Sequence, residues 1–113
     1  MTFSLHSIEK KIVTYISGKP DILLVFLFGS VVKNNVHSES DIDIAILFER
    51  DISMDQSLKI EDDLTSLLRN ESDIVILNRS SPIIKMQVLQ TGKKIFERKP
   101  GVYGKFFVRT LNE

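Results

Sequence analysis

The sequence contains no cysteine among its 113 residues, so neither a disulfide framework nor a thiolate zinc site can form. Its two histidines, His6 and His37, are too far apart in sequence to suggest a metal-binding pair. The longest apolar run, Ile22–Phe28, has seven residues, far short of the ~20 that span a bilayer. Charged residues such as Glu9 and Lys10 interrupt any apolar start, so no secretory signal is visible. These absences predict a cytoplasmic protein without membrane segments.

An excess of basic charge is also missing. Fifteen basic and fifteen acidic side chains cancel to a formal net charge of zero. Because a basic surface is the usual footprint of a nucleic-acid binder, direct binding of DNA or RNA is not expected. The length predicts one domain over residues 1–113, with a packed sheet and a few helices but no deep cleft between two domains. If the chain is an enzyme, we therefore expect a substrate or a partner to complete its site.

Hydrophobic spacing predicts helices and strands along the whole chain. Apolar residues three and four positions apart indicate a helix over residues 4–17, and the run Ile22–Phe28 is typical of a strand buried on both faces. A capping box formed by Ser53 and Gln56 marks the start of a helix that we expect to run to about Arg69. Further strands are expected at residues 41–48, 73–77 and 94–97, and further helices at residues 82–90 and 103–111.

The order of these elements predicts the fold class α+β, with a mixed sheet of about four strands and helices packed on it. The connection between the first two strands is short enough for them to be antiparallel neighbours, whereas a helix separates the second strand from the third. The helix that begins after Ser53 is expected to bury five apolar side chains: Met54, Leu58, Leu64, Leu67 and Leu68.

Three aspartates occupy the starts of predicted strands: Asp41, Asp43 and Asp73. Residues two apart in a strand share a face, so Asp41 and Asp43 point the same way. If the third strand lies beside the second, all three carboxylates converge at one edge of the sheet. Carboxylates are costly to bury unless they are paired or bind a cation, and hard oxygen ligands suit Mg²⁺. The pattern therefore predicts a Mg²⁺ site, and two ions would suit an in-line phosphoryl displacement.

Gly29 and Ser30 directly follow the first strand and supply a second feature of a phosphate site. Glycine lets the backbone approach a phosphate closely, and a helical turn beginning at Val31 would present free N–H groups to it. The Ser30 hydroxyl adds a donor. From the residues alone, Lys33 is better explained as a solvated loop lysine than as a phosphate ligand. No Walker A string, G-x-x-x-x-G-K-[ST], occurs in the chain.

Gly29-Ser30, ten intervening residues and Asp41-Ile42-Asp43 together resemble the G-S-x10-D-x-D signature of minimal nucleotidyltransferase (MNT) domains of the DNA polymerase beta superfamily. These domains are antitoxins paired with HEPN-type ribonuclease toxins. The resemblance extends through Asp73 to Phe96 and so covers most of the chain. It implies a polymerase-beta-like nucleotidyltransferase core that transfers AMP from ATP to a tyrosine hydroxyl on the HEPN partner, which silences the toxin.

The resemblance also implies residue roles in nucleotide binding. Gly29 and Ser30 would hold the triphosphate, and Lys33 would supply the basic charge near it. Many members of the family carry a basic residue and a glycine in the first helical turn, where this chain has Val31-Val32-Lys33-Asn34.

For the aspartates, the resemblance implies that Asp41 and Asp43 bind the metal ions. Asp73 would be the third carboxylate and metal ligand, and it could also act as the base toward the incoming hydroxyl. The alternative from the residues alone is that these are ordinary solvated carboxylates at strand starts, which is a stronger alternative for Asp73 because aspartate is common after turns.

Other functions stay open at this level. A non-catalytic antitoxin would keep the fold and neutralise its toxin by covering it, and the altered turn after Ser30 is the feature that favours this alternative. Transfer to a small-molecule hydroxyl would require an added helical domain, for which this chain has no room.

Overall fold

The structure is a computed structural model in which residues 4–29 and 42–113 are described. In these ranges the predicted helices and strands are present, and the bounds of each lie within one residue of the predicted bounds. The bounds are α1 Leu5–Ser17, β1 Ile22–Phe28, β2 Ile42–Phe48, α2 Met54–Leu68, β3 Ser72–Ile76, α3 Pro82–Thr91, β4 Lys93–Glu97 and α4 Val102–Leu111, with a short 3-10 helix, η2, at Leu77–Arg79.

Serine side chains begin three of the helices. Ser4 accepts a hydrogen bond from the Ser7 amide at the start of α1, and Ser81 caps α3, in which Pro82 is the first residue. At α2 the predicted capping box is present, since Ser53 and Gln56 satisfy each other's backbone amides. Such caps satisfy N–H groups that have no partner within the helix, which explains why these helices begin where they do.

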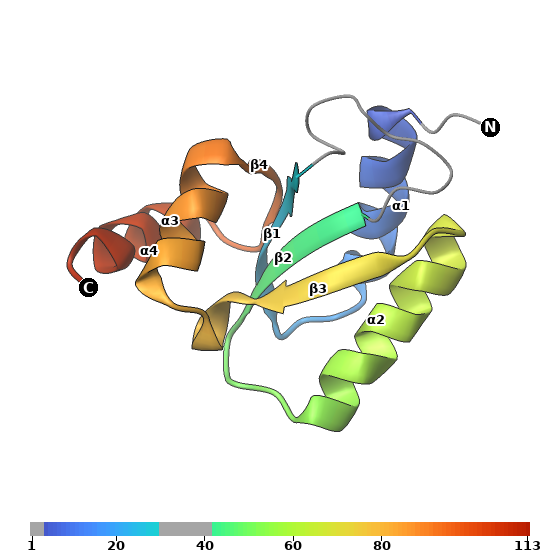
Figure 1. Ribbon diagram of the computed structural model, residues 1–113, viewed down its shortest axis with the longest axis horizontal. Coiled ribbons are helices and arrows are strands. Elements are labelled where there is room, and N and C mark those ends of the chain that lie inside the picture. The colour runs from blue at the N-terminus through green and yellow to red at the C-terminus, as the bar shows by residue number, and fades with distance from the viewer. Residues whose placement is uncertain (1–3, 30–41) are drawn as a thin grey trace.

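The four strands form one mixed sheet in the order β3-β2-β1-β4 (Figure 1). β1 is antiparallel to both β2 and β4, whereas β2 and β3 are parallel. The predicted antiparallel pairing of the first two strands is therefore confirmed, and the third strand lies beside the second. None of the helices in the described ranges is long and apolar enough to cross a membrane.

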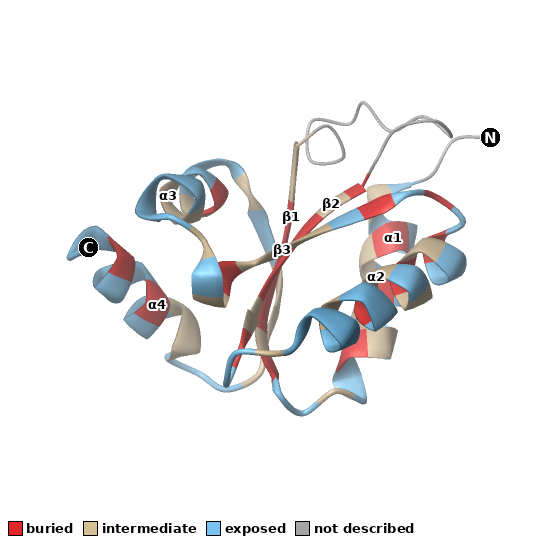
Figure 2. Ribbon diagram, turned by 60° about the horizontal axis from the view of Figure 1, so that its bottom comes forward, coloured by how far each residue is buried: buried red, intermediate tan, exposed pale blue. Residues whose placement is uncertain are grey.

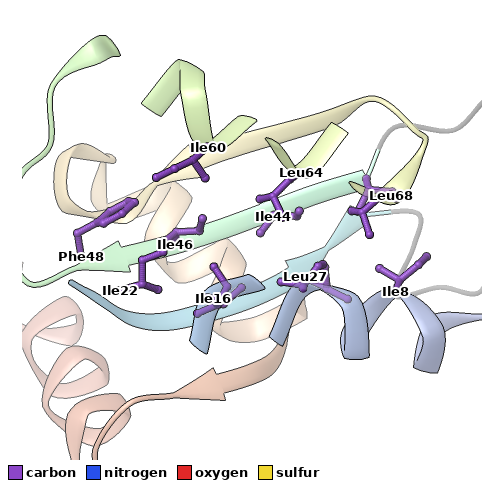
Figure 3. Packing of buried hydrophobic residues seen from close by; sticks show 13 residues of the cluster. Ile8, Ile16, Ile22, Leu27, Ile44, Ile46, Phe48, Ile60, Leu64 and Leu68 are labelled. Carbon is purple, nitrogen blue, oxygen red and sulfur yellow. The ribbon is translucent and has the colours of Figure 1, made fainter. Parts of the chain in front are cut away.

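One face of the sheet is covered by α1 and α2 (Figure 2). Leu27 of β1 and Ile44 and Ile46 of β2 point toward these helices and pack with Ile8 and Leu64, and all are buried (Figure 3). Full burial of such a side chain stabilises the fold by about 1.5–3 kcal/mol. This larger cluster is the main core of the domain.

The opposite face carries α3 and α4 (Figure 2). Phe26 of β1 and Ala45 of β2 pack there with Val88 of α3 and Phe106 of α4. Both central strands are thus covered on both faces, which explains their continuous apolar sequences.

The buried face of α2 differs from the prediction. Leu64 and Leu68 are buried as expected, but Met54, Leu58 and Leu67 have exposed fractions of 62%, 53% and 38%. Ile60 takes their place in the core. The spacing of Ile60, Leu64 and Leu68 places these three side chains on one stripe of the helix, and this stripe rather than the neighbouring one faces the sheet.

Candidate active site

The starts of the parallel strands β2 and β3 bring two of the predicted aspartates together. Asp43 is the register partner of Asp73 in the parallel ladder, and on its other side it pairs with Phe28, the last residue of β1. Adjacent strands lie about 4.8 Å apart, so the two carboxylates leave neighbouring points of the backbone. The two aspartates therefore lie side by side at one end of the sheet, as predicted, while their chemical roles stay predictions.

Both aspartates emerge on the face of the sheet that carries α3 and α4. Ile42 and Ile44, on either side of Asp43, belong to the cluster beneath α1 and α2, and side chains alternate along a strand. Ala45, two residues beyond Asp43, belongs to the opposite cluster. Asp43 is half-buried and Asp73 is exposed. Of the two carboxylates, that of Asp73 is therefore the more open to solvent.

Gly29 follows β1 directly and lies against Asp43. Its φ is 78°, in the left-handed region that glycine adopts without steric cost. A β-carbon at this position would collide with the Asp43 carboxylate and would lie 3.3 Å from its Cγ. The backbone angle favours glycine here, and a larger residue would also displace the Asp43 carboxylate.

Three of the predicted site residues, Ser30, Lys33 and Asp41, lie outside the described residues, as does the turn expected from Val31. Their contributions to phosphate and metal binding stay predictions. Across residues 4–29 and 42–113, no group of three or more potential metal ligands is found.

Asp43 and Asp73 nonetheless fit the chemistry of a Mg²⁺ site. They offer the hard oxygen donors that this ion prefers, and Mg²⁺ usually takes one or two carboxylates together with water and substrate phosphates. Together they could supply both of these carboxylates, and Asp41 would add a third.

Two side-chain contacts that hold these strands in place were not predicted from the sequence. Asn78 of η2 forms two hydrogen bonds with the backbone of Phe48, its Nδ2 donating to the carbonyl and its Oδ1 accepting from the amide, both at 2.8 Å. Thr65 of α2 accepts a hydrogen bond from the Ser72 amide at 3.2 Å. No local pattern signals either contact, because each joins separate elements of the fold.

Comparison with known proteins identifies the family. The family described as polymerase beta, nucleotidyltransferase matches residues 10–101. The chain is similar to the protein adenylyltransferase MntA of Shewanella oneidensis, with 32% identity over 89 residues. Those residues are 78% of this chain and 64% of that relative, so the chain spans less than two-thirds of the length of MntA.

Solved structures have the same fold. A chain in the crystal structure of a toxin–antitoxin with AMP-PNP is 30% identical, with a TM-score of 0.83 over 92% of this chain and 84% of that chain. A chain in the structure of tri-AMPylated Shewanella oneidensis HEPN toxin with MNT antitoxin is 27% identical, with a TM-score of 0.80 over 96% of this chain and 84% of that one. The family match includes both paired aspartates and covers most of the sequence, and this chain belongs to the polymerase beta nucleotidyltransferase family.

Proposed function

We propose that this chain is a Mg²⁺-dependent protein adenylyltransferase that transfers AMP from ATP to a tyrosine hydroxyl of a HEPN toxin and so acts as its antitoxin. The observation that carries the proposal is the pairing of Asp43 with Asp73, with Gly29 held against the Asp43 carboxylate. The relatives support the reaction class, since one is named a protein adenylyltransferase and another is an MNT antitoxin with a tri-AMPylated HEPN toxin.

In this reaction the tyrosine oxygen attacks the α-phosphorus of ATP, the bond between the α-phosphorus and the bridging oxygen breaks, and pyrophosphate leaves. Asp43, with Asp41, would hold Mg²⁺, and two such ions would neutralise charge on the attacking and leaving oxygens. Asp73 would complete the carboxylate set and accept the proton from the incoming hydroxyl. Gly29 lets the backbone and the Asp43 carboxylate approach each other, while Ser30 and Lys33 would bind the triphosphate.

The acceptor is proposed to be a protein because the similar proteins include a protein adenylyltransferase and an MNT antitoxin with a tri-AMPylated HEPN toxin. Asp73 is exposed, so a tyrosine on the surface of a partner can reach the carboxylates from solvent. We further propose that the reaction takes place in the cytoplasm, where ATP and Mg²⁺ are available.

The direct test is the intact mass of a cognate HEPN toxin after incubation with this chain, ATP and Mg²⁺. We expect one or more added adenylate masses with the wild type and none with Asp43→Asn, because the amide weakens the metal site. Asp62→Asn is the matched control, since Asp62 is an exposed carboxylate on α2. Unmodified toxin that is nevertheless bound and neutralised would instead identify a non-catalytic antitoxin.

A thermal denaturation series tests the metal assignment without a partner. Like charges on neighbouring strands repel, so Asp73→Asn is expected to raise the melting temperature in the absence of Mg²⁺. Added Mg²⁺ should stabilise the wild type by mass action and should stabilise Asp73→Asn less. Equal shifts with Mg²⁺ in both proteins would contradict metal binding by Asp73.

A further inference from the structure

The two backbone amides that flank Asp73 are bonded to α2. β3 is an edge strand, so alternate N–H groups point away from the sheet. The Ser72 amide donates to Thr65 Oγ1 at 3.2 Å, and the Ile74 amide donates to Glu61 Oε2 at 3.4 Å. Thr65 and Glu61 are four residues apart and lie on the same side of the helix. Side chains of α2 thus hold the strand immediately before and immediately after the third carboxylate.

Thr65 also organises the turn that leads from α2 into β3. Its carbonyl accepts a hydrogen bond from the amide of Arg69, which ends the helix with a φ of 54°. The same carbonyl accepts from the Asn70 amide at 3.3 Å. One residue therefore fixes the left-handed turn through its backbone and the first amide of β3 through its hydroxyl.

The same turn is joined to the strand that carries Asp43. The Ile42 amide donates a hydrogen bond to the Glu71 carbonyl at 2.9 Å. Ile42 directly precedes Asp43, and Glu71 lies two residues before Asp73. Movement of the turn would consequently change the position of one aspartate relative to the other.

We propose that Thr65 and Glu61 are positioning residues for Asp73, because their contacts set where this carboxylate stands relative to Asp43. The inference rests on the proposed adenylyl transfer for its effect on activity. Catalysis that depends on placement is sensitive to small displacements, and about 1 Å of misplacement can cost about 100-fold in rate. Loss of the acceptor of the buried Ser72 amide also lowers global stability, so rates are compared at a temperature where all variants are folded.

The test compares two substitutions of Thr65. Thr65→Val keeps the shape of the side chain and removes the acceptor, and it is expected to lower kcat for AMP transfer about 10- to 100-fold with the KM for ATP unchanged. Thr65→Ser keeps the hydroxyl and should retain most of the rate. At Glu61, Gln keeps an acceptor oxygen whereas Met removes it, so Glu61→Met should be the slower enzyme. Ser66→Val, at an exposed neighbour on α2, is the matched control.

Amide hydrogen exchange provides a readout that does not depend on activity. In Thr65→Val the amides of Ser72 and Asp73 should exchange faster than in the wild type, while those of the central strand β1 stay unchanged. An inactive wild type would overturn the proposed function, and the exchange data would still test the positioning. Unchanged exchange at Ser72, or a Thr65→Ser enzyme as slow as Thr65→Val, would overturn the positioning role.

Discussion

Replacing Gly29 with alanine perturbs the backbone and the site at once. Gly29 has a φ of 78°, and it costs a residue with a β-carbon roughly 1–2 kcal/mol to adopt the left-handed conformation. The added methyl group would also collide with the Asp43 carboxylate. Relief of that collision requires the carboxylate to move, and it would then leave its position beside Asp73.

Two other glycines separate these effects. Gly101 has a φ of 94°, but no atom lies within 4 Å of the point where an added β-carbon would stand, so Gly101→Ala introduces the backbone cost without a collision. Gly104 lies within α4 and also has open space around it. Because alanine favours a helix over glycine by roughly 0.5–1 kcal/mol, Gly104→Ala is expected to stabilise the protein.

Urea titration and AMP transfer are the two assays for this series. Gly29→Ala and Gly101→Ala should each lower the free energy of unfolding by about 1–2 kcal/mol. A loss of AMP transfer, on the order of 100-fold, is expected for Gly29→Ala alone because it moves Asp43. If Gly29→Ala transferred AMP as fast as Gly101→Ala, the contact with Asp43 would have no role in the site and the reasoning would fail.

Two further predictions concern stability away from the site. Arg98 donates hydrogen bonds to three backbone carbonyls around the connection from α1 to β1, those of Ile16 (3.1 Å), Lys19 (2.7 Å) and Ile22 (3.1 Å). Arg98→Met should lower the free energy of unfolding in urea by about 2–4 kcal/mol, because charge-assisted bonds are lost. Asp63 accepts a hydrogen bond from the Tyr15 hydroxyl at 2.7 Å, and this bond holds the pKa of the carboxyl below its usual 3.8. A carboxyl whose pKa is lowered by folding stabilises the fold at pH values above its pKa in the unfolded chain, and this stabilisation is lost as the pH falls through its pKa in the folded protein. The difference in melting temperature between the wild type and Tyr15→Phe should therefore be larger at about pH 6 than at about pH 2.

The strands could be predicted from sequence because their ends and their interiors carry separate signals. β1 is a continuous apolar run that stops at Gly29, and the structure gives it the predicted bounds. In β2 the alternation of aspartate and isoleucine predicted which side chains share a face of the sheet. The prediction is confirmed, since Ile42 and Ile44 are buried on one face and Asp43 lies on the other. A strand has a two-residue period, so one buried residue determines the orientation of its neighbours.

The buried side of α2 could not be predicted in the same way. Met54 and Leu58 are four residues apart, as are Leu64 and Leu68, so both pairs satisfy helical spacing. Which stripe is buried depends on where the sheet lies, and Ile60, on the same stripe as Leu64, packs into the core. That choice is made by tertiary contacts and not by the spacing.

The placement of Asp43 beside Asp73 could be predicted from sequence, whereas the residues that support the two strands could not; the metal-binding roles stay predictions. Asp43 was identified by its spacing from Gly29-Ser30 and Asp41, and Asp73 as a third aspartate that enters an apolar strand. In the sequence, nothing distinguishes Thr65 and Asn78 from other polar residues. In the fold they accept hydrogen bonds from the backbone amides of Ser72 and Phe48. Their importance depends on contacts between elements, which a single sequence does not reveal.

The arrangement of the paired aspartates bears on the choice between an adenylyltransferase and a purely binding antitoxin. Asp43 and Asp73 are partners in direct register, and like charges placed opposite each other on neighbouring strands are unfavourable. Gly29 adds a further cost, because glycine loses more conformational freedom on folding than other residues. A module that only covered its toxin would gain nothing from these costs, since the core beneath α1 and α2 supplies its stability independently. A shared cation would convert the repulsion into common coordination. This reasoning supports the proposed adenylyltransferase over the binding antitoxin, and metal binding by the two aspartates stays part of that proposal.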